Sequence, residues 1–284
     1  MLIRLGRGLA NGCRGGAVES SPYLDGVIAS AVCDLDATCL DSYGGSGQTW
    51  SNLIASPADG AAQADYDFYL GADGSASTDD PTFTGTAGDT AAYFAMDGSN
   101  DFFTIKGGNT SFINAMHKTT GGSSWWVAFI GYIDSTAANG QGNIAGTTAG
   151  YSLGPGINIR HNTRTANRKM IASINGDTGA DTFVGTDTLA EDSYYFAVMS
   201  FDAATGNLRS YLNTLTAETD TLSLNATTSD AGYALTIGNN GYNDHPYPKG
   251  RIIHFSMGND SIDDSDAAAI IAHLETRHGR DYTP

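Results

Sequence analysis

Apolar and polar residues alternate along most of this chain in short runs, which Gly, Asn and Asp residues separate. A period of two places successive side chains on opposite faces of an extended backbone, so each run predicts a β-strand. The clearest example is 194–213, where two apolar runs flank a polar turn containing Gly206 and Asn207. Because Gly and Asn tolerate the positive φ of a tight reversal, this segment predicts a β-hairpin. Further strands are predicted at 27–35, 66–70, 157–160, 169–174, 182–186, 234–237 and 251–256.

Two other segments add to this all-β pattern. In 92–105, Asp97-Gly98 supplies a turn between two aromatic runs, which predicts a second hairpin. Segment 124–133 is almost continuously apolar and contains Trp125 and Trp126. A strand of this kind is covered on both faces, so we expect it at the centre of a sandwich.

The last element is predicted to be a helix over about residues 264–278. Asp263 is placed to cap its first turn, and Gly279 is a natural stop signal. Ile270, Ile271 and Leu274 form an apolar stripe at helical spacing. We therefore expect this helix to pack against the sandwich.

Short strands with polar turns favour a β-sandwich over alternating strand–helix units. The order of several motifs along the chain is also informative. In sequence they are Leu35-Asp36-Ala37, Trp50-Ser51-Asn52 after a Gly/Ser turn, the hairpins 92–105 and 194–213, and Gly250-Arg251-Ile252 before the last helix. Together they resemble the laminin-G-like, concanavalin A-like lectin/glucanase domains of phage and bacterial proteins over roughly residues 30–280. The resemblance implies an all-β, concanavalin A-like jelly-roll sandwich with an extended N-terminal arm and a short C-terminal α-helix.

The chain is expected to divide into an arm at 1–25 and one jelly-roll domain at 26–284. The arm is rich in Gly and carries Arg4, Arg7 and Arg14 before the first acidic residue, Glu19. One alternative for this segment is a frayed terminus. The other, which we favour, is a basic anchoring arm that lies along an acidic neighbouring subunit.

Charge and cysteine content exclude several classes of function. The net charge is −17 and the pI is about 4.4, which disfavours binding to nucleic acid. No segment is apolar for long enough to span a bilayer or to act as a secretory signal. The odd set of Cys13, Cys33 and Cys39 predicts three free or buried thiols rather than a disulfide framework or a zinc site.

From the sequence we expect that the protein is not an enzyme. Relatives of this sandwich that cleave glycans use paired carboxylates in an E-x-D-x-(x)-E pattern on one strand. The glutamates here, Glu19, Glu191, Glu218 and Glu275, do not show that spacing, and no G-x-S-x-G motif is present. Asp residues at 97–101 and 73–80 could supply oxygen ligands for Ca²⁺, although a hairpin turn explains the first group. We therefore assign no metal or cofactor, and Ca²⁺ is the one left open.

The best candidate for recognition is the loop 238–249, which places two aromatic rings among amide, acidic and basic groups. Such a mixture suits a glycan, since rings stack on sugars while amides and acids bind hydroxyls. The alternative is a structured loop whose tyrosines pack on the sandwich edge or on another subunit. The residues singled out for glycan or subunit contact are Asn240, Tyr242, Asp244, His245 and Tyr247.

Two hypotheses of function follow. The first is a non-enzymatic structural component of a phage or phage-like particle, such as an accessory head, collar or tail protein. Its arm would bind other particle subunits, its lectin-like body would contact host surface glycans, and it would form a homo-oligomer. It would be assembled in the host cytoplasm and released in the virion by lysis. The second hypothesis is a free carbohydrate-binding module.

Overall fold

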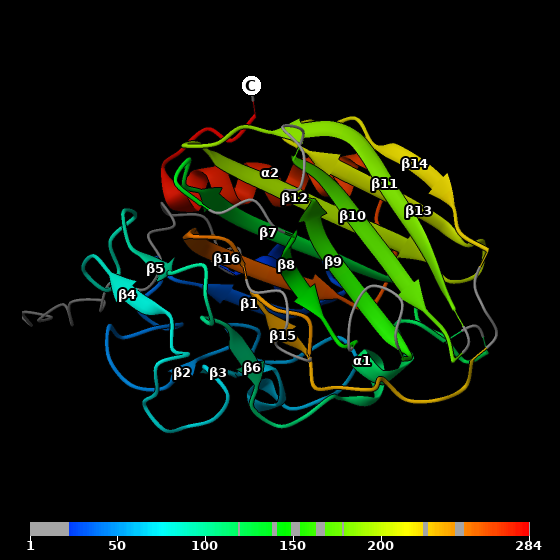
Figure 1. Ribbon diagram of the computed structural model, residues 1–284, viewed down its shortest axis with the longest axis horizontal. Coiled ribbons are helices and arrows are strands. Elements are labelled where there is room, and N and C mark those ends of the chain that lie inside the picture. Colours follow the sequence, from blue (N-terminus) through cyan, green and yellow to red (C-terminus); the bar gives the residue numbers. More distant parts are fainter. Residues whose placement is uncertain are drawn as a thin grey trace, which may run out of the picture.

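The computed structural model describes residues 23–118, 120–137, 141–148, 154–162, 168–177, 179–223, 227–241 and 247–283. Two antiparallel sheets face each other and a C-terminal helix covers part of the outer face of one of them (Figure 1). The all-β sandwich with a C-terminal α-helix that the sequence predicted is therefore confirmed. The predicted arm at 1–25 lies almost entirely outside the described residues, and its anchoring role stays a prediction.

The first sheet, called sheet A here, is the middle layer of the molecule. Its strand order is β14-β13-β12-β7-β16-β5-β4, and β1 also pairs with β16. The strands are β1 (Ala31–Asp36), β4 (Thr82–Thr84), β5 (Tyr93–Met96), β7 (Trp125–Ile133), β12 (Tyr194–Asp202), β13 (Asn207–Leu212), β14 (Glu218–Thr221) and β16 (Gly250–Gly258).

The second sheet, sheet B, has the order β11-β10-β9-β8-β15-β6-β3-β2. Its long strands come from the middle of the chain and its short strands from the N-terminal third, apart from β15. They are β2 (Thr49–Trp50), β3 (Phe68–Leu70), β6 (Phe103–Ile105), β8 (Gln141–Gly146), β9 (Gly156–Asn162), β10 (Arg168–Asn175), β11 (Ala180–Leu189) and β15 (Thr236–Ile237).

Two 3₁₀ turns and two α-helices complete the described part of the chain. The two 3₁₀ turns are η1 (Leu24–Gly26) and η2 (Gln63–Tyr66), and the α-helices are α1 (Ser111–Ala115) and α2 (Asp264–His278). The bounds of α2 agree with the prediction. Asp263 caps it by accepting hydrogen bonds from the backbone N–H groups of Ser265 and Asp266, and Gly279 ends it at φ 60°.

The core has two parts because sheet A is covered on both sides. One cluster fills the space between the sheets, and the other lies between sheet A and α2. Along β12, Tyr195 and Met199 belong to the first cluster, whereas Phe196 and Val198 belong to the second. This explains why the runs at 124–133 and 194–202 are apolar at nearly every position.

One expectation about the cysteines is wrong. Cys33 is a free and fully buried thiol, as predicted, but Cys39 is disulfide-bonded. No helix in the described ranges is both long and apolar enough to cross a bilayer.

Candidate functional site

Four strands of sheet A carry a row of three tyrosines and one arginine on the face that also packs against α2. Arg251 of β16 is the register partner of Tyr132 of β7, which in turn is the register partner of Tyr194 of β12. Tyr93 extends the row on β5. All four residues are only half-buried, and Tyr93 and Tyr194 pack at the margin of the cluster between sheet A and α2. We call them the tyrosine–arginine row.

The row holds the guanidinium group of Arg251 between aromatic rings. That group lies 4.6 Å from the ring centroid of Tyr93 and 4.5 Å from that of Tyr132. Its Nη1 donates to the hydroxyl of Tyr194 over 3.0 Å, and the rings of Tyr132 and Tyr194 are 5.3 Å apart. Cation–π contacts on two sides and one hydrogen bond therefore fix this cation in place.

A second arginine approaches the same tyrosine from the C-terminal segment. Arg280 follows α2 directly, and its guanidinium group lies 4.3 Å from the ring centroid of Tyr194. Its Nη2 donates to the carbonyl of Thr90, which precedes β5. The ring of Tyr194 is thus close to two positive charges, because the guanidinium group of Arg251 lies 5.9 Å from its centroid.

Neither arginine has a carboxylate partner within 4.0 Å among the residues that the structure describes. This is notable in a chain with 31 acidic and 14 basic residues. One acidic residue is hydrogen-bonded to the row. Asp192 accepts from the hydroxyl of Tyr132 over 3.2 Å and from the N–H of Ser135. Five other described cations have acidic partners, in Lys106–Asp67, Lys118–Asp230, Arg168–Glu191, Arg209–Asp264 and Lys249–Asp134, whereas Lys169 has none among the described residues.

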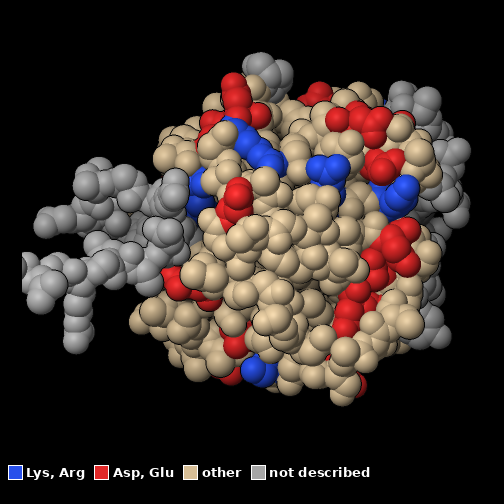
Figure 2. All heavy atoms as spheres, turned by 90° about the vertical axis from the view of Figure 1, so that its left-hand side faces the viewer, with Lys and Arg blue, Asp and Glu red and all other residues tan. Residues whose placement is uncertain are grey.

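Figure 2 views the molecule from the side where β5 and the C-terminal end of α2 lie in Figure 1. Lys and Arg side chains form a band across the upper half of this face, with Asp and Glu side chains around the band. Most of the remaining surface in this view is uncharged. An acidic protein therefore presents a local group of cations on this side.

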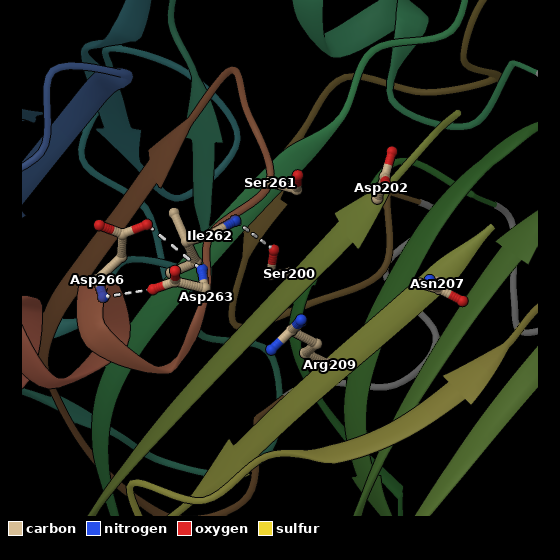
Figure 3. A pocket seen from close by; sticks show the side chains of 8 residues that line it. All are labelled: Ser200, Asp202, Asn207, Arg209, Ser261, Ile262, Asp263 and Asp266. Carbon is tan, nitrogen blue, oxygen red and sulfur yellow. Dashed lines mark hydrogen bonds between the residues drawn. The ribbon is translucent and has the colours of Figure 1, made fainter. Parts of the chain in front are cut away.

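A separate pocket of about 210 Å³ lies where β12 and β13 meet the start of α2 (Figure 3). Its lining is polar, but the side chains already have internal partners. Ser200 accepts from the N–H of Ile262, Asp263 caps α2, and Arg209 pairs with Asp264. The pocket is lined by Ser200, Asp202, Asn207, Arg209, Ser261, Ile262, Asp263 and Asp266.

Two carboxylates of this pocket, Asp202 and Asp263, lack the raised pKa that the general acid of glycoside cleavage requires. A general acid must keep its proton near neutral pH, so its pKa has to be raised. Hydrogen bonds from Thr205 and from the N–H of Ala204 lower the pKa of Asp202. The pKa of Asp263 is lowered by its bonds from Ser265 and from the N–H of Asp266. Both carboxylates are stabilised in the charged form and serve local structure.

The structure also brings together a buried charge cluster between β1, β16 and α2. Asp36, His254 and His278 could place three ligand atoms around a metal ion, and all three are buried. However, Arg277 donates to Asp36 over 3.0 Å and thus supplies a cation to that carboxylate. Burial lowers the pKa of His278, although the charge of Asp36 and the hydrogen bond to it act in the opposite direction. The cluster is explained as the contact that attaches α2 to the sandwich.

The predicted recognition loop is only partly described. Asn240 and Tyr247 are fully buried. The hydroxyl of Tyr247 pairs with that of Tyr195 over 2.8 Å, and its ring packs on His161. Neither residue presents a surface for a sugar, so both fit the alternative of a loop that packs on the sandwich. Tyr242, Asp244 and His245 lie outside the described residues, as do Arg4, Arg7 and Arg14 of the predicted arm.

The tyrosine–arginine row was not singled out from the sequence. Period-two alternation places Tyr132 and Tyr194 on the outer face of their strands, and that signal was available. Their meeting with Arg251 depends on the register of three strands that are far apart in the sequence. A run of residues cannot supply that register.

Comparisons with known proteins support the fold. No protein-family model matches this sequence, and no curated protein matches it. The structure is similar to the binding domain of Paraclostridial Mosquitocidal Protein 1, with a TM-score of 0.59 and 9% identity, over 85% of this chain and 52% of that one. It is also similar to the botulinum neurotoxin serotype D ligand-binding domain solved with N-acetylneuraminic acid, with a TM-score of 0.55 and 10% identity, over 85% and 50% of the two chains.

A third similar structure is domain 4 of a GH43 extracellular arabinanase from Geobacillus stearothermophilus, solved in complex with arabinotriose. The TM-score is 0.50 and the identity 12%, over 84% of this chain and 96% of that one. The chain spans about half the length of the two toxin domains. At these identities the similarity establishes the β-sandwich fold alone.

Proposed function

We propose that this chain is a non-enzymatic carbohydrate-binding module and that its glycan contacts the tyrosine–arginine row. The observation that carries the proposal is the row itself, where half-buried tyrosines and a fixed guanidinium group lie on one face of sheet A. Sugars present C–H faces that pack on aromatic rings and hydroxyls that need hydrogen-bond partners. The row offers both kinds of contact at one place.

The similar structures support the same class of function. One is a ligand-binding domain solved with N-acetylneuraminic acid, and another is a domain of an arabinanase solved with arabinotriose. Fold alone does not determine function, so this support is by analogy.

The particle hypothesis is compatible with this proposal and stays a prediction. A component of a phage-like virion could use its sandwich to bind host glycans and its arm to bind other subunits. Deleting residues 1–25 is expected to abolish incorporation into a particle and to leave glycan binding unchanged. Gradient sedimentation of native material with mass spectrometry of the fractions tests it. Normal assembly of the truncated chain would remove the anchoring role.

A glycan array probed with the purified chain tests the carbohydrate-binding proposal. We expect binding to a limited set of glycans, and we expect Tyr132→Ala and Tyr194→Ala to weaken it. Tyr69→Ala is the matched control, because Tyr69 is also half-buried and lies near a cation, Lys106, but on sheet B. Binding that is absent from the whole array, or that Tyr69→Ala weakens as strongly as the row variants do, would contradict the proposal.

A further inference from the structure

We infer that the tyrosine–arginine row selects glycans that carry a carboxylated sugar, and that Arg251 binds the carboxylate. This inference rests on the proposed function and adds the chemical class of the ligand. It concerns the positive charges of Arg251 and of the neighbouring Arg280 rather than the rings of the row. Three observations lead to it.

The first observation is that most hydrogen-bond donors of Arg251 are unused. A guanidinium group has five N–H donors in a planar fork. In the described structure Arg251 gives one hydrogen bond, from Nη1 to the hydroxyl of Tyr194. No other hydrogen bond joins its guanidinium group to a described residue, and none of its nitrogens is among the fully buried atoms that lack a partner. The free donors are therefore available to a ligand.

The second observation is that the guanidinium group is already fixed. The rings of Tyr93 and Tyr132 lie within 4.6 Å of it and the hydroxyl of Tyr194 orients its edge. A free arginine side chain loses much rotamer freedom when it binds an anion. Here that loss occurs on folding, so a carboxylate binds to a preorganised fork.

The third observation is that neither arginine is directly paired with a carboxylate. Among the described residues no carboxylate lies within 4.0 Å of Arg251 or Arg280, although both approach the ring of Tyr194. At physiological salt the distant acids of the chain are screened beyond about 8 Å. The local pair of cations thus decides which ligands are attracted.

A carboxylated sugar matches these features better than a neutral sugar or a long polyanion. The planar carboxylate of such a sugar accepts two parallel hydrogen bonds from a guanidinium group, and the sugar ring can pack beside the tyrosines. A neutral sugar can accept hydrogen bonds through its hydroxyls, but it would cover the cation without supplying a counter-charge, which costs binding energy. A polymer with one charge per unit would extend beyond the row and meet the net charge of −17.

The test compares ligands that differ only in the carboxylate. Titration calorimetry would use 3′-sialyllactose against lactose, and digalacturonate against its dimethyl ester. We expect the acidic member of at least one pair to bind about tenfold to a hundredfold more tightly, the range for a hydrogen bond to a charged group. Added NaCl is expected to weaken the binding of the acidic ligand only.

Variants then assign the effect to Arg251. Arg251→Gln is expected to remove the preference for the acidic ligand and to keep weak binding of the neutral one. Arg280→Gln is expected to reduce the preference partly. Arg209→Gln is the matched control, because Arg209 is also an arginine of sheet A but is already paired with Asp264. Thermal unfolding of each variant shows whether it is folded.

The outcomes separate the inference from the proposed function. Equal binding of the acidic and neutral members of both pairs would overturn the inference and leave the carbohydrate-binding function intact. A preference that survives in Arg251→Gln and Arg280→Gln would also overturn it. If no glycan binds at all, the proposed function itself fails. Should Arg251→Gln not fold, the ester comparison and the salt dependence decide the question with the wild-type chain.

Discussion

Arg277, near the end of α2, donates from Nη2 to Oδ2 of Asp34 in β1 over 2.9 Å, although 243 positions separate the two residues in the chain. The same guanidinium group donates from Nη1 to Asp36 over 3.0 Å, and all three side chains are buried. Asp34 and Asp36 are the two carboxylates of a buried network that also includes His254 and His278. The last helix of the domain is thus attached to its first strand by charge as well as by apolar packing.

Replacing Arg277 is expected to be among the most damaging single changes to this fold. Arg277→Met keeps most of the side-chain volume but leaves two buried carboxylates without their cation. We expect the free energy of unfolding to fall by about 3–5 kcal/mol, as when one member of a buried ion pair is removed. Denaturant titration measures it. Arg209→Met is the control, since its pair with Asp264 is exposed and should contribute less than about 1 kcal/mol.

Stability is expected to fall as the pH drops from 7 towards 4, and His161 should contribute one proton to that change. Burial, followed by the charge of Arg168, lowers the pKa of His161 to about 3. The unfolded chain therefore binds a proton near pH 6.5 that the folded chain does not bind until about pH 3. A group with a lowered folded pKa of this kind favours folding at high pH, and its contribution is lost as the pH falls.

The variant His161→Phe isolates this contribution. Both ring nitrogens of His161 lack a hydrogen-bond partner and the ring packs edge-on against Tyr247, so phenylalanine removes no hydrogen bond. Between about pH 6 and 4, the slope of unfolding free energy against pH should decrease by up to about 1.4 kcal/mol per unit. Chemical denaturation at several pH values measures both slopes. Equal slopes for the two proteins would show that His161 is not held neutral in the fold.

The sequence predicted the elements whose cause is local. The hairpin at 194–213 follows from a Gly-Asn turn between apolar runs, and the structure has β12 and β13 there. The helix after Asp263 follows from a cap, a stripe and a glycine stop, and its bounds are confirmed. The short edge strands β4 and β14 escaped prediction. Their residues are mostly exposed and carry no apolar alternation, so only their partners in the sheet hold them extended.

The site was harder to predict because its residues come from separate parts of the chain. Sequence reasoning favoured the loop 238–249 for its mixture of aromatic and polar residues. Tyr247 proves to be an interior residue, because its hydroxyl finds a buried partner in Tyr195. The row at Arg251 has an unremarkable local sequence. Its distinctive property, a guanidinium group between two rings, exists only after β5, β16 and β7 have paired.

Close packing of sheet A against the N-terminal segment predicts that Gly258 tolerates no side chain. A Cβ atom at this position would lie 2.1 Å from Nε1 of Trp126 and 2.6 Å from the carbonyl oxygen of Ser30. Gly258→Ala should therefore destabilise the protein by about 1–3 kcal/mol or more through overpacking. Gly44→Ala is the control, because nothing lies within 4 Å of its Cβ position and its effect should stay within about 0.5 kcal/mol. Thermal unfolding compares the two, and similar melting temperatures would contradict the packing argument.

Asp101 is expected to destabilise the fold at neutral pH. Its effect on the pH dependence of stability is opposite to that of His161, which destabilises the fold at low pH. Burial raises its pKa to about 6, and the charges of Asp97, Asp80 and Asp79 add to the effect, although the N–H of Asp97 donates to it and lowers the pKa. A carboxyl group with a raised folded pKa favours folding while it is protonated, and this contribution is lost as the pH rises through about 6. Asp101→Asn keeps an acceptor for the Asp97 N–H and removes the charge. It should stabilise the protein at pH 7 by about 1 kcal/mol and have no such effect at pH 4.

The same variant decides whether Ca²⁺ binds at these acidic loops, the one cofactor that the sequence left open. One carboxylate oxygen each of Asp79 and Asp80 is buried without a hydrogen-bond partner, and both lie near Gly71. A divalent cation among these groups would offset the repulsion that raises the pKa of Asp101. We expect millimolar Ca²⁺ to raise the melting temperature of the wild-type protein more than that of Asp101→Asn, and EDTA to reverse the rise. Mg²⁺ at the same concentration controls for ionic strength. An equal response of both proteins to both ions would exclude a specific Ca²⁺ site at Asp101, because simple screening of the acidic surface would then explain the effect.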